Sequence, residues 1–135
     1  IPEDIDEAIK WYKKAAEQGD IKAQKKLGEI YSNGARKKDP EAIKWYKMAA
    51  ERGDAEALKR LGDIYEKENA LEAVKWYKMA VEQGNASASF YLGLIYEYGK
   101  PGIPKNKAEA IKWYRKAAEQ GSETAQKNLR KLENE

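Results

Sequence analysis

The side chains that most often carry out enzyme chemistry are scarce in this sequence. It contains no His and no Cys, which removes imidazole bases, thiolate nucleophiles, disulfides and the common zinc ligands. The few serines have no His to activate them. Paired carboxylates could hydrolyse a glycoside, but carboxylates scattered over a solvated surface need no such role, so we expect a non-catalytic protein without a cofactor. The serines are Ser32, Ser87, Ser89 and Ser122.

Two other residue patterns could indicate binding chemistry. Trp and Tyr occur 4 and 9 times and could stack on nucleobases or sugars, but they recur at helical spacing and are therefore expected in the core. The acidic cluster between Glu3 and Glu7 could bind a metal ion. It lies where a helix is expected to begin, however, and carboxylates there stabilise the helix dipole. We expect no metal site.

Charge and hydropathy exclude two further classes of partner. Lys and Arg total 26, Asp and Glu total 23, and the two signs are interleaved along the chain. Nucleic-acid binding needs a concentrated basic stripe, whereas the longest basic run, residues 36–38, ends at Asp39. No stretch of about 18 apolar residues could span a membrane, and no signal peptide is visible. We expect a soluble protein, in the cytoplasm or, if a signal peptide was removed, in the periplasm or outside the cell.

The aromatic residues belong to an internal repeat. Four segments share the pattern Ala-Ile/Val-Lys-Trp-Tyr, and each runs on to a Gly. A second segment follows each Gly and carries Leu-Gly and then Tyr in the first three copies, whereas the fourth copy has Leu129-Arg130. The repeated residues are Trp11, Trp45, Trp76 and Trp113, then Gly19, Gly53, Gly84 and Gly121, then Leu27-Gly28, Leu61-Gly62 and Leu92-Gly93.

Both segments have the apolar spacing of amphipathic helices, and residues at their ends predict where the helices start and stop. Each repeat Gly precedes Asp, Asn or Ser, which is typical of a left-handed helix stop next to an N-cap. Asp39 precedes Pro40 as an N-cap precedes a first helical residue. Capping boxes are expected for Asp4 with Glu7, Asn69 with Glu72 and Asn106 with Glu109. The expected helices are 4–18, 20–33, 39–52, 54–67, 70–83, 85–98, 106–120 and 122–133.

The alternation of these helices predicts the fold. One pair of helices cannot bury its apolar face alone, but stacked pairs bury a continuous seam. We therefore expect an all-α protein, an alpha-alpha superhelix in the form of a right-handed solenoid with a concave side.

The pattern Ala-x-x-x-Leu-Gly-x-x-Tyr, a variable loop, then Ala-x-x-Trp-Tyr-x-x-Ala-Ala-x-x-Gly resembles the Sel-1-like repeat, a relative of the tetratricopeptide repeat, over nearly the whole chain. In that family's phase, the single domain 1–135 holds repeats 20–53, 54–84 and 85–121, between a lone helix 4–18 and a terminal helix 122–133. Ile1-Pro2 aligns with Ile103-Pro104 in the middle of a loop, so a piece of a longer array or an engineered array is expected. Family members stabilised by Cys pairs are no guide here, because this chain has no Cys.

The resemblance also implies where a partner binds, because in tetratricopeptide-like proteins the first helix of each repeat lines the concave groove. In the third repeat these positions carry Phe90, Leu94 and Tyr98, an apolar line next to Tyr91 and Glu97. Exposed apolar patches and aromatic residues often mark interaction sites. The alternative is that Phe90 and Tyr98 pack on the next helix. Earlier repeats carry charged residues at related positions, namely Lys25 and Glu29, then Lys59 and Asp63.

These residues predict a groove with an apolar floor near Phe90 and mixed charge toward Lys25 and Lys59, suited to an extended or helical peptide. The expected function is a non-catalytic scaffold or adaptor for a protein or peptide, as a monomer or with weak end-to-end association. An engineered or consensus-derived array without a natural partner is the alternative, and a hydrolase is less favoured. Repeat lengths of 34, 31 and 37 residues argue against a pure consensus design.

Overall fold

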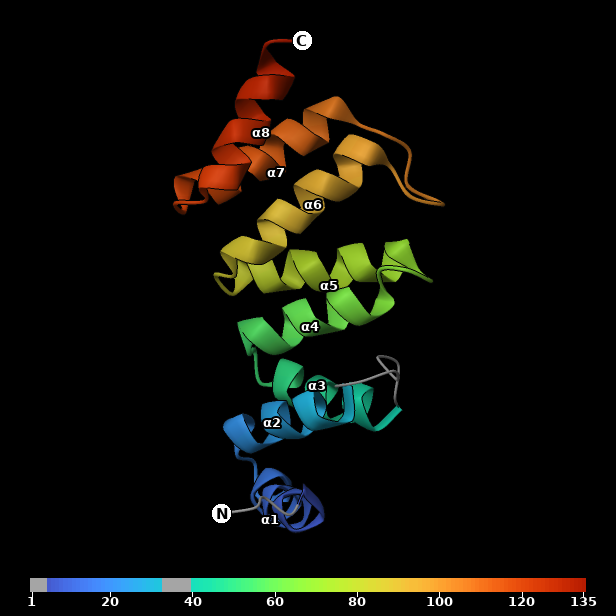
Figure 1. The fold of residues 1–135 in the computed structure, drawn as a ribbon, viewed down its shortest axis with the longest axis vertical. Helices are drawn as coiled ribbons and strands as arrows, with labels where there is room; N and C mark the ends of the chain where they lie inside the picture. Colours follow the sequence, from blue (N-terminus) through green and yellow to red (C-terminus); the bar gives the residue numbers. More distant parts are fainter. Residues whose placement is uncertain (1–4, 33–39) are drawn as a thin grey trace.

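The computed structural model describes residues 5–32 and 40–135, which form helices and no strand. Figure 1 shows the helices following one another along one long axis, from α1 at one end to α8 at the other. Each helix packs on its neighbours in sequence. The expected all-α solenoid of paired helices is therefore confirmed. The helices are α1 (Ile5–Glu17), α2 (Ile21–Ser32), α3 (Pro40–Glu51), α4 (Ala55–Tyr65), α5 (Ala70–Glu82), α6 (Ala86–Tyr98), α7 (Lys107–Glu119) and α8 (Glu123–Glu133).

The helix ends agree with the expected ends to within two residues wherever these fall among the described residues. Gly19 has a φ of 94°, a left-handed conformation that favours glycine and stops α1. The residue after each repeat Gly caps the next helix, as where the Ala57 amide donates to Asp54 Oδ2 at 2.9 Å. The expected caps at Asp4 and Asp39 lie outside the described residues. The other N-caps that accept a backbone amide are Asp20, Asn69, Asn85, Asn106 and Ser122.

A glycine in each of α2, α4 and α6 makes room for a tyrosine ring of the helix that follows. Gly62 lies so close to Tyr77 that a Cβ on this glycine would lie 2.5 Å from the nearest ring carbon. The ring is fully buried, so only glycine allows the two helices this approach. We call these three pairs the glycine–tyrosine contacts, and they join each Leu-Gly helix to the next Trp-Tyr helix. They are Gly28 with Tyr46, Gly62 with Tyr77 and Gly93 with Tyr114.

A second recurring contact joins a tryptophan to the glutamate one helical turn before it. The Trp113 indole N–H donates to Glu109 Oε2 at 2.9 Å. The expected capping box is therefore only half right, because Asn106 caps the Glu109 amide while its own amide donates to the Tyr96 carbonyl instead. This leaves the Glu109 carboxylate for the indole. The same indole-to-carboxylate bond joins Trp45 to Glu41 and Trp76 to Glu72.

The expectation that all four tryptophans lie in the core is wrong for one of them. Trp45 and Trp113 are 2% and 7% exposed, and Trp76 is partly buried, but Trp11 is 61% exposed. Trp45 packs into a cluster with Ala16 and Leu27 of the two preceding helices. Among the described residues α1 is the first helix, so no preceding pair covers Trp11.

None of the helices in the described ranges combines the length and the apolar character that a membrane span requires.

Candidate functional site

The nine residues expected to bind a partner lie on α2, α4 and α6, the Leu-Gly helices. In the third repeat, Phe90 and Leu94 are partly buried, whereas Tyr98 is 65% exposed at the end of α6. The apolar line is therefore partly buried at Phe90 and exposed at Tyr98. The charged members, Lys25, Glu29, Lys59 and Asp63, lie on α2 and α4.

Phe90 packs on the next pair of helices, as the alternative interpretation expects. Its ring centroid lies 5.9 Å from those of both Tyr91 and Tyr114. Phe90 and Leu94 also pack against the apolar cluster formed by α7 and α8. Both side chains therefore contribute to the core and leave only part of their surface for a partner.

Three of the expected site residues, Lys59, Asp63 and Tyr91, form one contact network with Tyr77. This network links α4, α5 and α6. Lys59 Nζ lies 2.8 Å from Asp63 Oδ2 and 4.9 Å from the centroid of the Tyr91 ring. The Tyr77 hydroxyl donates to Asp63 Oδ1 at 2.6 Å, and the Tyr77 and Tyr91 rings stack at 5.7 Å. Lys59, Asp63 and Tyr91 are thus brought together, and a buried tyrosine that sequence reasoning assigned only to the core holds them in place.

Glu97 also has an internal partner, because the Tyr114 hydroxyl donates to Glu97 Oε1 at 2.6 Å. Burial raises the pKa of Tyr114, and the hydrogen bond to the Glu97 carboxylate raises this pKa further. The pKa of Tyr77 is raised by burial and then by Asp63 in the same way. Asp63 and Glu97 therefore stabilise neutral buried phenols. Sequence reasoning missed this role of the two carboxylates. The signal for it is an Asp or Glu within one helical turn of the Leu-Gly pair, on the side that faces the tyrosine of the next helix.

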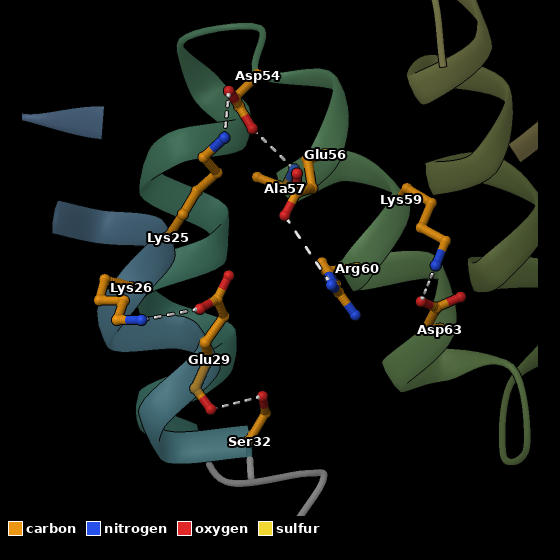
Figure 2. A network of polar contacts seen from close by, with 10 residues as sticks. All are labelled: Lys25, Lys26, Glu29, Ser32, Asp54, Glu56, Ala57, Lys59, Arg60 and Asp63. Carbon is orange, nitrogen blue, oxygen red and sulfur yellow. Dashed lines mark hydrogen bonds and ion pairs between the residues drawn. The ribbon is translucent and has the colours of Figure 1, made fainter. Parts of the chain in front are cut away.

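In the first repeat, an ion pair joins α2 to the N-cap of the next Leu-Gly helix, α4. Figure 2 shows Lys25 reaching from α2 to Asp54, the N-cap of α4, with Nζ 3.4 Å from Oδ1. On the same helix, Lys26 Nζ lies 3.7 Å from Glu29 Oε2. Lys25 and Glu29 thus remain apart from the network around Lys59, and their charges are satisfied within the first two repeats.

The third repeat replaces that ion pair with neutral groups and leaves a hollow. Phe90 occupies the position of Lys25, and Ser122, the N-cap of α8, occupies the position of Asp54. A cavity of about 310 Å³ opens between the start of α6 and the turn from α7 to α8. Among the described residues, no Asp, Glu, Lys or Arg lines this hollow, which could hold an uncharged side chain. Its lining residues are Ala86, Ser87, Phe90, Tyr91, Gln120, Gly121, Ser122 and Thr124.

In the described part of the chain, no three potential metal-ligating side chains gather. Two members of the acidic cluster, Glu3 and Asp4, lie outside it.

Comparison with known proteins identifies the repeat. The Sel1 repeat family model matches residues 1–20, 21–54, 55–85 and 86–122. No curated protein matches the sequence.

Solved structures with the same fold come from several bacteria. The protective antigen c5321 of uropathogenic Escherichia coli, which displays an SLR fold, is 38% identical with a TM-score of 0.78, over 90% of this chain and 27% of that protein. A Sel1 repeat protein from Oxalobacter formigenes is 40% identical with a TM-score of 0.76, over 93% and 54%. Helicobacter pylori cysteine rich protein B is 27% identical with a TM-score of 0.65, over 92% and 93%.

This chain spans about a quarter of the Escherichia coli protein and about half of the Oxalobacter protein. The family model nevertheless covers it almost from end to end, and the helices stack as in those structures. The chain therefore belongs to the Sel1 repeat family, whose members commonly act as protein-interaction scaffolds and are generally non-catalytic.

Proposed function

We propose that this chain is a non-catalytic scaffold that binds a peptide or protein segment along α6. The observation that carries the proposal is the neutral hollow beside Phe90, at the position where the first repeat is closed by Lys25 and Asp54. Tyr98, 65% exposed, provides a second apolar contact at the other end of the same helix.

The geometry of α6 suggests the length of the bound segment. Phe90 and Tyr98 are eight residues apart, or about 12 Å along a helix axis. An extended peptide rises about 3.3 Å per residue, so roughly four residues would connect a side chain in the hollow to one on Tyr98. The ligand we expect is a short extended segment with an uncharged apolar side chain at each end. Lys59 and Asp63 beside Tyr91 would lie next to its flank and favour polar residues there.

Selection from a phage-displayed peptide library on the purified chain tests this proposal. We expect selected peptides to lose at least tenfold in affinity for Tyr98→Ala and for Ser87→Arg, which places a long side chain at the rim of the hollow. Both positions are exposed, so the thermal midpoint should stay within the range of ordinary surface substitutions. Ile5→Ala is the matched control, because Ile5 is 62% exposed on α1, away from α6.

The outcome that contradicts the proposal is equally specific. Peptides that bind Tyr98→Ala, Ser87→Arg and wild type equally well would place binding elsewhere. Failure to select any peptide would favour an array without a partner at this surface. Substitution of both Phe90 and Leu94 is a poorer test, since both side chains contribute to the cluster with α7 and α8.

A further inference from the structure

Side chains fill the gaps between the first three tight turns of the molecule. The turns from α1 to α2, α3 to α4, α5 to α6 and α7 to α8 follow one another along one edge (Figure 1). Arg52 Nη1 donates to the Gly19 carbonyl, in the turn before it, at 3.4 Å. Gln83 has the same repeat position and lies against the turn before it, because a Cβ on Gly53 would lie 3.7 Å from Gln83 Oε1.

The gap between the third and fourth turns is open instead. Gln120 has the repeat position of Arg52 and Gln83. A Cβ on Gly84, in the turn before it, would nevertheless meet no atom of the described residues within 4 Å. Gln120 is exposed and lines the hollow beside Phe90. Its side-chain amide therefore offers the hollow both hydrogen-bond donors and an acceptor.

The hollow combines aromatic rings with polar side chains. The Phe90 and Tyr91 rings of α6 lie 5.9 Å apart and are tilted by 59°, so a third ring could contact both. The hollow also lies at the N-terminal ends of α6 and α8, whose dipoles disfavour a cation. A cavity of about 150 Å³ can hold benzene, and this one measures about 310 Å³. Its polar lining residues are Ser87, Gln120, Ser122 and Thr124.

We infer that the hollow binds a tyrosine side chain of the partner segment, with the ring on Phe90 and Tyr91 and the hydroxyl hydrogen-bonded to Gln120. This inference rests on the proposed function and names the side chain that enters the hollow. Aromatic rings prefer centroid distances of about 4.5–7 Å, which a third ring beside the first two can adopt. Phenylalanine would leave the polar lining without a partner, and leucine would lack the contact between rings.

Amides of single amino acids test the inference without a peptide ligand. N-acetyl-tyrosinamide and N-acetyl-phenylalaninamide differ only in the hydroxyl group, and each is titrated into the isotope-labelled chain and followed by NMR. We expect the tyrosine compound to shift the side-chain amide resonances of Gln120 at millimolar concentrations. It should bind about threefold to tenfold more tightly than the phenylalanine compound, as one hydrogen bond contributes. Ser87→Arg should abolish the shifts caused by both compounds, because the long side chain blocks the rim of the hollow.

Gln120→Ala should remove the preference for tyrosine, so that the two compounds bind equally well. Gln18→Ala is the matched control, because Gln18 has the same repeat position at the end of α1, far from the hollow in sequence and on another helix pair. In this control the preference should equal that of wild type. Both glutamines are exposed, so both variants should keep the thermal midpoint expected of surface substitutions.

Three results would overturn the inference: equal affinity of the two compounds for wild type, a preference that survives Gln120→Ala, or no shift at Gln120. The proposed function would stand in each case if selected peptides still lose affinity for Ser87→Arg and Tyr98→Ala. Conversely, a tyrosine preference that depends on Gln120, with no peptide selected from the library, would support the tyrosine site and contradict binding of a segment along α6.

Discussion

Replacement of Gly62 by alanine tests the glycine–tyrosine contact most directly. In the interior of a helix, alanine is normally more stable than glycine by about 1 kcal/mol. At Gly62 the new Cβ would lie 2.5 Å from the nearest ring carbon of Tyr77, whereas ordinary contact begins at 3.4 Å. The ring or the helix must therefore move by about 0.9 Å.

The Tyr77 ring has little freedom to move. Its hydroxyl is bound to Asp63 at 2.6 Å, its face stacks on Tyr91 at 5.7 Å, and it is fully buried. Overpacking at such a site costs about 1–3 kcal/mol. After the gain in helix propensity, we expect Gly62→Ala to lower the free energy of unfolding by up to about 2 kcal/mol.

Urea denaturation followed by circular dichroism measures this difference, and a thermal scan should show a midpoint lower by up to about 8 °C. Position 130 provides the matched control, because α8 has the same place in the repeat and no tyrosine ring of the described residues covers it. There, Arg130→Ala should be more stable than Arg130→Gly, by up to about 1 kcal/mol. A stabilised Gly62→Ala protein would refute the reasoning, since helix propensity alone would then explain both positions.

Two further outcomes follow from the hydrogen bonds of the buried aromatic residues. Glu109→Ala should destabilise the protein by about 1–2 kcal/mol because it leaves the Trp113 indole N–H without its acceptor, while Glu109→Gln should cost less; urea denaturation and the indole N–H resonance measure this, and equal costs would contradict it. The second outcome concerns Tyr114, whose pKa is raised in the folded protein by burial and then by Glu97. Its stabilising contribution is complete below the unfolded pKa of about 10 and is lost as the pH rises above it, by about 1.4 kcal/mol per unit. Between about pH 9 and pH 11, wild type should therefore lose more stability than Tyr114→Phe, and parallel losses would contradict this cause.

The helices and their order could be predicted because local signals agree with the period of the apolar residues. Gly19 stops a helix and Asp20 caps the next one, and both effects depend on neighbours in sequence. The spacing of Trp and Tyr likewise predicted the buried side of α3 and α7.

Contacts between helices could not be predicted in the same way. Periodicity predicts that Trp11 lies on an apolar face, but not whether another helix covers that face. It also does not indicate that Asp63 binds the hydroxyl of Tyr77, because those residues are fourteen positions apart on different helices. The sequence left two positions open for Phe90, in the groove or packed on the next helix, and its packing against Tyr114 depends on how closely α6 and α7 approach at Gly93.

Because of the glycine–tyrosine contacts, the register between two paired helices does not depend on the length of the connection that joins them. α4 and α5 are joined by residues 66–69, and α6 and α7 by residues 99–106. In both pairs, a Cβ on the glycine would nevertheless lie 2.5 Å from the nearest carbon of the tyrosine ring. The edge of the molecule that carries these connections thus accepts different lengths, and an epitope tag or a small folded module inserted between Pro101 and Gly102, which are both exposed, should leave the stack of helices intact.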